Sequence, residues 1–228
     1  MKLSVLVPVY NEEATVAELL RRVAAVPIEK ELLVVDDAST DGTGAILAGL
    51  DLPGLRVFRH EGNRGKGAAL RTALAHAVGE IVIIQDADLE YDPNDYARLI
   101  EPIERGQADV VYGSRFLAGR RVTTFWHYFV NTALTRLSNL LTGLRLTDME
   151  TCYKVFRADL IRGLTLVSDG FAIEPEMTAK AARRGARFVE VPISYRGRGR
   201  DEGKKIHWRD GFRTLAAIAR FHRFTREA

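Results

Sequence analysis

The chain has 228 residues, of which 46% are hydrophobic and 28% charged, and its formal net charge at pH 7 is +3. These values are ordinary for a folded, soluble domain, and the length suffices for one large domain or two small ones. The single cysteine, Cys152, excludes an internal disulfide and a cysteine-based zinc cluster. The N-terminal apolar run is too short for a signal peptide, and no window reaches the roughly 18 apolar residues of a membrane-spanning helix. We therefore expect a cytoplasmic protein that is not integral to a membrane.

Apolar runs alternate with helical patterns through the first half of the chain. The runs expected to form buried strands cover 3–9, 31–37, 55–59, 80–86 and 108–113. The segments with helical spacing between them cover 12–25, 40–50, 66–78 and 93–105. Near-continuous Val, Ile and Leu runs separated by helices predict an α/β fold with a doubly wound, mostly parallel sheet. In such sheets the ligand lies beyond the carboxyl ends of the strands.

The alternation stops after residue 115, and amphipathic helices follow. Residues 126–144 carry few charges and place their apolar side chains within an arc of about 140°. The apolar side chains of this arc are Trp126, Phe129, Val130, Ala133, Leu134, Leu137, Leu140, Leu141 and Leu144. The opposite face holds His127, Asn131, Thr135, Ser138 and Thr142. A strand at 186–195 and a helix at 206–222 complete what we expect to be a single domain.

The modest net charge hides a division between two halves. Residues 1–114 contain 11 Lys and Arg and 19 Asp and Glu, a net charge of −8. Residues 115–228 contain 22 and 11, a net charge of +11. The acidic half is suited to a cation and the basic half to phosphate or an anionic surface, although a solvated charge imbalance gives the same pattern.

Four carboxylates end the apolar run "IVIIQDADLEYDP" at residues 81–93. Asp92 precedes Pro93 and is typical of a helix N-cap. Asp86 and Asp88 come earlier and are two residues apart, so they project to one side of a continuing strand. Oxygen ligands without His or Cys favour Mg²⁺ or Mn²⁺, which takes one or two carboxylates and leaves other positions to water and phosphates. We therefore predict a metal between these carboxylates and a diphosphate.

Two further motifs end the first and second strands. Asp36 and Asp37 in "DDASTDGT" are placed to accept hydrogen bonds from a base or a ribose. A dinucleotide-binding fingerprint is absent, because "PVYNEEAT" has no glycine, and "EGNRGKGAAL" has the wrong spacing for a Walker loop. A nucleotidyltransferase would need a glycine-rich basic loop where this chain has "YNEE".

Together, "VPVYNEE", "VVDDASTDGT", "NRGKGAAL", "QDADLEYDP", "YGSR" and "VPISY…EGKKI" resemble the inverting GT-A glycosyltransferases of family 2. The order of the motifs is most similar to that of the dolichyl- and polyprenyl-phosphate sugar synthases. This resemblance implies a GT-A fold and metal-dependent, inverting transfer of a sugar from GDP-mannose or a UDP-sugar. The acceptor it implies is a dolichyl or undecaprenyl phosphate at the cytoplasmic membrane face, with no nucleic-acid partner.

The resemblance also implies roles for individual residues. The residues implied to bind the nucleotide sugar are Pro8, Tyr10, Glu12, Val35, Asp37, Asp86, Ala87 and Arg115. Val35 and Asp37 would lie against the base, and Arg115 near the donor or the acceptor phosphate. The implied metal ligands are Asp86, Asp88 and Glu90, with Asp88 also catalytic; relatives often have Gln at position 90. Arg198 and Lys204 match a basic pair at the acceptor phosphate.

The acceptor decides whether a catalytic base is needed. A phosphate monoester with a second pKa near 6 is largely dianionic at neutral pH and needs cations rather than a base. A soluble hydroxyl acceptor would need a carboxylate base, for which the candidates are Asp148, Glu150, Glu174 and Glu176. We favour Asp148, near the reacting sugar. A non-catalytic nucleotide-binding scaffold is the remaining alternative.

The last helix joins apolar and basic residues. Trp208, Phe212, Leu215, Ala216 and Ala219 share a face flanked by Arg209, Arg213 and Arg220. A basic amphipathic helix with aromatic residues suits an anionic lipid interface. We expect 126–144 and 206–222 to contact the membrane surface, a membrane subunit or the domain core.

Overall fold

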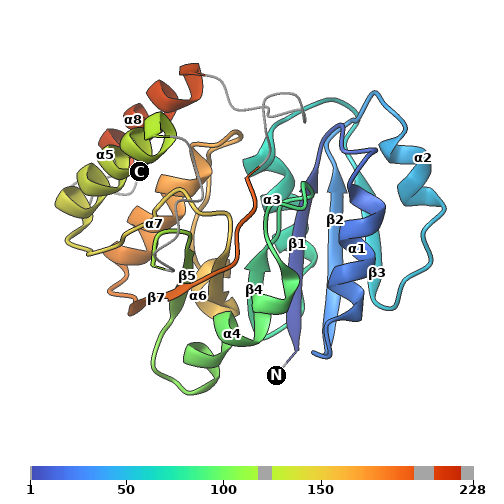
Figure 1. Ribbon diagram of the computed structural model, residues 1–228, viewed down its shortest axis with the longest axis horizontal. Helices are drawn as coiled ribbons and strands as arrows, with labels where there is room; N and C mark the ends of the chain where they lie inside the picture. Colours follow the sequence, from blue (N-terminus) through green and yellow to red (C-terminus); the bar gives the residue numbers. More distant parts are fainter. Residues whose placement is uncertain (1, 118–124, 198–207, 222–228) are drawn as a thin grey trace.

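The computed structural model describes residues 2–117, 125–197 and 208–221, and in these ranges one mixed sheet is flanked by helices (Figure 1). The strands are β1 (Leu3–Val9), β2 (Lys30–Asp36), β3 (Leu55–Arg59), β4 (Ile81–Ile84), β5 (Val110–Ser114), β6 (Lys154–Arg157) and β7 (Phe188–Pro192). The helices are α1 (Val16–Ala25), α2 (Thr43–Ala48), α3 (Lys66–His76), η1 (Pro93–Asp95, a 3₁₀ turn), α4 (Tyr96–Glu104), α5 (Phe125–Thr142), α6 (Ala158–Arg162), α7 (Ile173–Arg183) and α8 (Trp208–Phe221).

The strand order is β3-β2-β1-β4-β6-β5-β7, and every neighbouring pair is parallel except the two that involve β6. The predicted doubly wound, mostly parallel sheet is therefore confirmed. Val9 at the end of β1 pairs with Asp36 at the end of β2, and Leu6 of β1 pairs with Ile84 at the end of β4. The carboxyl ends of these three strands consequently meet at one edge, at the top of the sheet in Figure 1.

Helices cover both faces of the sheet. Helices α1 and α4 lie on one face, and α3, α6 and α7 on the other (Figure 1). The N-terminal turn of α4 follows the expected cap, because the Asp92 carboxylate accepts a hydrogen bond from the Asn94 amide at 3.0 Å. The core between these layers is continuous and holds the fully buried aliphatic side chains of β1, β2 and β4.

Strand β6 and helices α6 and α7 were not expected from the sequence. Strand β6 has four residues and pairs antiparallel with both β4 and β5. It begins with Lys154 and ends with Arg157, so the sequence contains only two apolar residues to signal it. Helix α7 carries two glutamates and two basic residues that its sequence suggests are exposed, whereas Glu174, Glu176 and Lys180 are buried.

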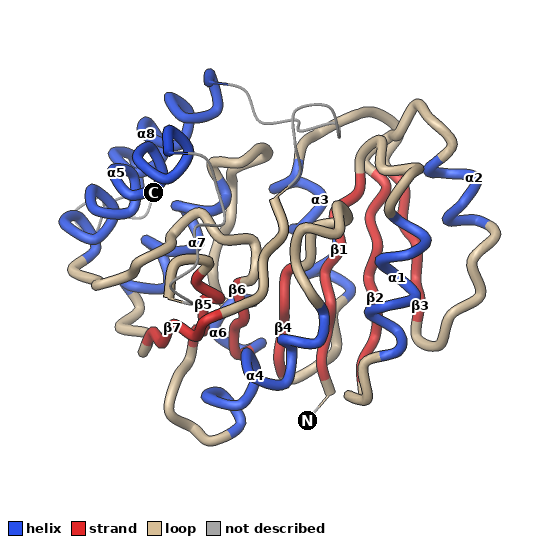
Figure 2. Tube along the Cα trace, viewed as in Figure 1, coloured by secondary structure: helices blue, strands red, loops and turns tan. Residues whose placement is uncertain are grey.

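Helices α5 and α8 lie side by side at the β7 end of the molecule and pack on α7 (Figure 2). The inward side of α5 includes hydroxyls: Thr135 and Ser138 are each 2% exposed. Part of the predicted apolar face, such as Leu134 and Leu137, packs partly buried on the core, whereas Leu140 is 76% exposed. The face of α8 that we singled out also points outward, because Leu215 is 42% exposed while Ala217 and Ile218 are buried. No helix in the described part of the chain combines the length and the apolarity needed to cross a bilayer.

Candidate active site

The edge where β1, β2 and β4 end brings "YNEE", "DDAS" and "QDADLE" together, as their spacing predicts. Each loop contains one non-glycine residue with positive φ: Asn11 at 52°, Ala38 at 60° and Leu89 at 60°. A positive φ is uncommon for such residues, and for a bulky side chain such as that of Leu89 it is a true outlier. Backbone strain of this kind concentrates at functional sites, where surrounding contacts hold it.

The first loop is tied directly to the Asp-x-Asp turn. The Thr15 hydroxyl lies 2.7 Å from the Ala87 carbonyl oxygen and 2.9 Å from a Glu12 carboxylate oxygen. The Glu12 amide donates to the Thr43 hydroxyl at 2.9 Å, which adds the loop after β2. Pro8 and Tyr10 lie at the same end of β1, and Tyr10 is 37% exposed. The loops after β1, β2 and β4 are therefore joined to one another by hydrogen bonds.

Asp37 holds the neighbouring loop in place. Its carboxylate lies 2.6 Å from His60 Nδ1 and accepts hydrogen bonds from the backbone amides of Arg64 and Gly65 at 2.9 and 2.6 Å. Asp37 is 3% exposed, and the predicted base-contacting Val35 is fully buried in β2. Asp37 therefore anchors the "NRGKG" loop, and contact of Val35 and Asp37 with a base stays a prediction.

Asp86 forms an ion pair with a lysine of the same chain, Lys66. Lys66 Nζ lies 2.8 Å from Asp86 Oδ1 and 2.9 Å from Glu174 Oε1. The second oxygen of Glu174 is paired with the ammonium of Lys154, which is fully buried. We did not single out Lys66 from the sequence, although the lysine in "NRGKG" was the available signal. Glu174 is thus part of a buried chain of alternating charges and does not fit the role of a catalytic base.

Buried groups fix the backbone around Asp86. Gln85 Oε1 accepts hydrogen bonds from the hydroxyls of Tyr96 and Tyr153 at 2.8 and 2.7 Å, and Gln85 is fully buried. The Asp86 amide donates to the Cys152 sulfur at 3.2 Å. These contacts leave the Asp86 side chain 26% exposed above a rigid support.

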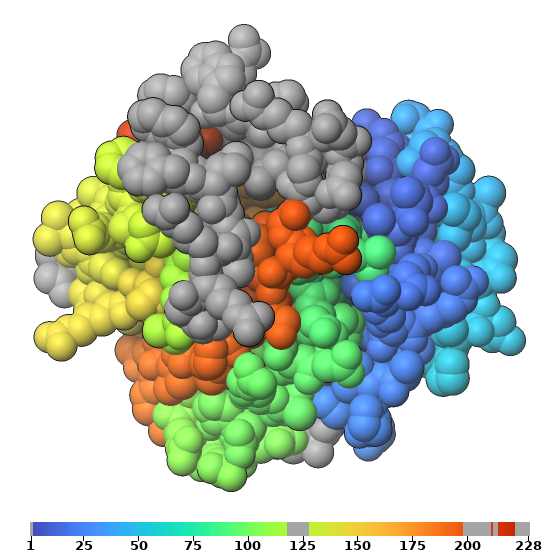
Figure 3. Space-filling model, in the orientation of Figure 1, coloured from blue at the N-terminus to red at the C-terminus, as the bar shows by residue number. Residues whose placement is uncertain are grey.

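Glu90 is bound from the other side of the site. Its carboxylate accepts a hydrogen bond from the Tyr195 hydroxyl at 2.8 Å, and its backbone oxygen accepts one from the Arg196 amide at 2.8 Å. The Glu90 amide donates to Asp88 Oδ1 at 3.1 Å. Figure 3 shows the segment after β7, in orange, lying across the green residues of this region. The chain after β7 therefore closes one side of the carboxylate edge.

The donor set of this edge fits a hard divalent cation. All its ligand atoms are oxygens, and the Lys66 ammonium already stands in for a cation on Asp86. Among the described residues no group of three or more His, Cys, Asp and Glu side chains could hold a metal by itself. A metal would therefore be held by Asp86 and Asp88 together with oxygens of water or substrate, and a contribution from Glu90 stays a prediction.

Arg115, after β5, and Asp148 form a bidentate ion pair. Arg115 Nε and Nη2 donate to the two Asp148 oxygens, each at 2.7 Å, and the Arg115 amide donates at 3.1 Å. Asn131 of α5 donates to the same carboxylate at 3.1 Å, and Asp148 is fully buried. Burial alone would raise the pKa of Asp148, but the Arg115 guanidinium holds it below its usual value. Both Asp148 oxygens are engaged and the carboxylate is weakly basic, and a catalytic role of Asp148 near the sugar stays a prediction.

The remaining acidic candidates differ from one another. Glu176 accepts hydrogen bonds from the amides of Val167 and Ser168 and pairs with Lys180 at 2.6 Å, so it is structural. Glu150 is half-buried, and its Oε1 has no hydrogen-bond partner among the described residues. Burial, opposed by Lys154, raises the pKa of Glu150 to about 7. Of the four carboxylates considered as bases, Glu150 alone has these properties.

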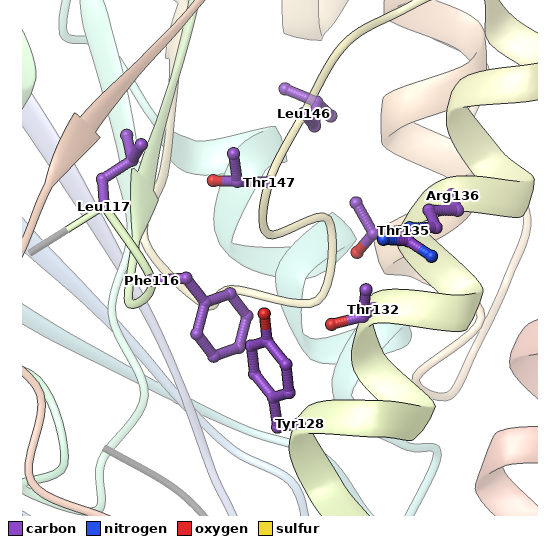
Figure 4. Close-up of a pocket in the computed structure, with 8 residues that line it drawn as sticks. All are labelled: Phe116, Leu117, Tyr128, Thr132, Thr135, Arg136, Leu146 and Thr147. Carbon is purple, nitrogen blue, oxygen red and sulfur yellow. The ribbon is translucent and has the colours of Figure 1, made fainter. Parts of the chain in front are cut away.

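A pocket of about 340 Å³ opens between the end of β5 and α5 (Figure 4). Its lining is mainly aromatic and aliphatic, with threonine hydroxyls and one guanidinium. The lining residues are Phe116, Leu117, Tyr128, Thr132, Thr135, Arg136, Leu146 and Thr147. The rings of Phe116 and Tyr128 meet edge to face with centroids 5.1 Å apart. Thr147 adjoins Asp148, so the pocket lies beside the Arg115 pair.

Arg198 and Lys204, the predicted acceptor-phosphate pair, lie outside the described residues. The side chains of Trp208, Arg209, Phe212 and Arg213 in the predicted interface helix are likewise not described. Their roles stay predictions.

The fold is similar to that of solved glycosyltransferase structures. The crystal structure of glucosyl-3-phosphoglycerate synthase from Mycobacterium tuberculosis, in complex with Mn²⁺, UDP and phosphoglyceric acid, matches 100% of this chain and 80% of that chain. The TM-score is 0.75 and the identity 22%, a likeness that shows the GT-A fold. The model of glycosyl transferase family 2 matches residues 4–165. The chain therefore belongs to glycosyl transferase family 2 and is a glycosyltransferase.

Two relatives extend the likeness over most of the chain. The undecaprenyl-phosphate mannosyltransferase of Micrococcus luteus is 32% identical over 216 residues, which cover 90% of this chain and 87% of that protein. The polyprenol monophosphomannose synthase of Mycolicibacterium smegmatis is 32% identical over 203 residues, which cover 84% of this chain and 76% of that protein. The expected resemblance to polyprenyl-phosphate sugar synthases is confirmed.

Proposed function

We propose that this glycosyltransferase moves a sugar, with inversion, from a nucleoside diphosphate sugar to a polyprenyl phosphate, using Mg²⁺ or Mn²⁺. The observation that carries the donor and metal part is the oxygen-lined edge at the end of β4, where Asp86 already binds an ammonium group. The names of both relatives supply the acceptor class. Mn²⁺ and UDP accompany the related fold in the Mycobacterium tuberculosis synthase.

The reaction needs cations more than it needs a base. When the bond from the anomeric carbon to the diphosphate breaks, the leaving nucleoside diphosphate gains negative charge, and a divalent metal at Asp86 and Asp88 would offset it. A phosphate acceptor attacks as a dianion, so no protein group has to remove a proton. The occupied, weakly basic state of Asp148 agrees with such an acceptor.

The acceptor would approach from the side of α5. Arg115, 15% exposed in its side chain, supplies positive charge next to the donor edge, and Arg198 and Lys204 are proposed to add to it. The pocket between β5 and α5 offers an apolar surface beside this charge, suited to the first isoprene units of the lipid (Figure 4). A phosphate on Arg115 with a hydrocarbon chain against Phe116 and Tyr128 would satisfy both features.

The outward faces of α5 and α8 are proposed to rest on the cytoplasmic face of the membrane. The exposed apolar side chains of these helices are Tyr128, Phe129, Val130, Leu140 and Leu215, with exposures between 42% and 76%. The outward side of α5, which exposes Phe129, Val130 and Leu140, is suited to a hydrocarbon environment. The net charge of +11 on residues 115–228 favours anionic lipid.

A transfer assay tests the proposed reaction. The protein is incubated with labelled GDP- or UDP-sugars, Mn²⁺ and short-chain polyprenyl phosphate, and the label is followed into the organic phase. We expect lipid-linked label that requires both the metal and the phosphate group, with the matching polyprenol as the control acceptor. Label recovered only as free sugar, or equal transfer in the presence of EDTA, would contradict the proposal.

Glu150 favours one alternative, transfer to a soluble hydroxyl acceptor. Its unpartnered Oε1 and its pKa of about 7 suit a general base at neutral pH. In that case Glu150→Gln abolishes transfer, whereas Arg198→Ala and Lys204→Ala leave it intact. The polyprenyl-phosphate proposal requires the opposite pattern.

A further inference from the structure

Lys66 is paired with Asp86, the carboxylate proposed to bind a divalent metal. Its ammonium group is 2.8 Å from Asp86 Oδ1, and its side chain is 11% exposed. The lysine follows Gly65, whose φ of 94° and whose hydrogen bond to Asp37 fix the start of α3. The position of Lys66 is therefore set by the backbone and is not that of a freely moving surface side chain.

A second carboxylate holds Lys66 from the opposite side. Glu174 Oε1 lies 2.9 Å from the Lys66 ammonium, and Glu174 is 3% exposed. The other Glu174 oxygen is bound by Lys154, so Asp86, Lys66, Glu174 and Lys154 form a line of alternating charges. Lys66 can leave Asp86 and still remain paired with Glu174, which lowers the cost of its displacement.

A metal on Asp86 and an ammonium group on the same oxygen exclude each other by charge and by space. Once the metal is bound, the displaced Lys66 ammonium faces the edge at which a diphosphate would bind. An anionic diphosphate then attracts both the metal and Lys66, whereas the metal alone must compete with Lys66. The two ligands would consequently bind with positive coupling.

We propose that Lys66 competes with the divalent metal for Asp86. The diphosphate of the donor draws Lys66 away from Asp86, so that metal and nucleotide bind cooperatively. The inference rests on the proposed metal-dependent function and deepens it. Lys66 is a positioning residue in this scheme, and Glu174 is the group that keeps it at the site after displacement.

Binding of Mn²⁺ to the full chain tests this proposal without any turnover. Free Mn²⁺ is measured by electron paramagnetic resonance, with and without GDP or UDP, for the wild type and for Lys66→Met. We expect Lys66→Met to bind Mn²⁺ alone at least about fivefold more tightly and to lose most of the nucleotide enhancement. Lys66→Arg keeps the charge and should bind Mn²⁺ alone as weakly as the wild type.

Lys180→Met is the matched control, because it removes another buried lysine, paired with Glu176 on α7, that lies outside the line of alternating charges. Thermal unfolding identifies any variant that has lost its fold. If folded Lys66→Met, Lys180→Met and the wild type bind Mn²⁺ with equal affinity, the competing role of Lys66 is overturned. The proposed metal dependence is not affected by that result. Absence of Mn²⁺ binding in every variant, with and without nucleotide, would overturn the metal dependence of the proposed function as well.

Discussion

The proposed donor half, residues 1–114, and the proposed acceptor half, residues 115–228, place their carboxylates in different ways. Between residues 1 and 114, Asp37 directly follows β2 and is held by His60 and two backbone amides. Asp86 lies two residues after β4 and is paired with Lys66. Beyond residue 115, Asp148 and Glu176 are buried in pairs with Arg115 and Lys180. Asp86 stays partly exposed, at 26%, beside the proposed metal site, whereas Asp148 and Glu176 are buried in ion pairs that hold the fold together. The predictions below test this contrast, beginning with the largest effect.

The largest effect is expected at the donor edge. Asp88→Asn should lower the rate of sugar transfer by well over a hundredfold, because it removes a proposed metal ligand. Even the loss of a residue that only hydrogen-bonds to a metal ligand typically lowers activity by about 10–100-fold. Thermal unfolding should change little, since Asp88 is only partly buried. Transfer rates with saturating Mn²⁺ measure the effect. An Asp88→Asn variant with normal transfer activity would contradict a metal site at Asp88.

The acceptor half should respond in stability. Asp148→Asn leaves the Arg115 guanidinium without its carboxylate in a buried position, and breaking such a pair costs about 3 kcal/mol or more. Urea unfolding measures the loss. The control is Glu18→Gln, which breaks the exposed pair with Arg22 and should cost less than about 0.5 kcal/mol. Equal losses in the two variants would contradict the structural role of Asp148.

Glu150 is expected to make stability depend on pH. Its folded pKa of about 7 lies above its unfolded value, so the folded protein binds the additional proton and stability falls as pH rises through the range from about 4.5 to 7. Glu150→Gln should therefore be more stable than the wild type at pH 8, by about 3 kcal/mol at most, and nearly equal at pH 4.5. Urea unfolding at both values measures it. A constant difference would show that Glu150 is not the titrating group.

The smallest change in stability is expected at the outward face of α5. Leu140 is 76% exposed, so Leu140→Gln should alter unfolding by less than about 0.5 kcal/mol. Together with Val130→Ser it should nevertheless weaken co-sedimentation with anionic vesicles several-fold. Val78→Ser, at a residue 64% exposed and far from α5 in sequence, is the control. Unchanged sedimentation would favour a protein partner at this face instead of lipid.

The sequence predicted the strands of residues 1–114 well because their signals are local. Each carboxylate follows an apolar run, and the parallel order brings the strand ends together without further information. Lys66 was missed because its partner Asp86 lies 20 residues away and Glu174 more than 100, so no spacing reveals the contact.

The acceptor half was harder for the same physical reason. The charges of Lys154 in β6 and Glu174 in α7 suggested exposed loops, and only their mutual neutralisation permits burial. The amphipathic pattern of α5 was read correctly, but its orientation depends on Asn131 and Thr135 bonding to the segment around Asp148 and Met149. Periodicity cannot show which face of a helix is buried when the polar side chains of one face can find hydrogen-bond partners inside the protein.

The central claim is that a divalent ion binds at the carboxylate edge after β4 and offsets the charge of a departing nucleotide. The most direct measurement is anomalous diffraction from a crystal of the protein grown with Mn²⁺ and GDP or UDP. The account predicts an anomalous peak within coordination distance of the Asp86 and Asp88 carboxylates. The diphosphate should bind the same metal ion. A nucleotide bound at this edge with Lys66 still on Asp86 and no anomalous peak would contradict it.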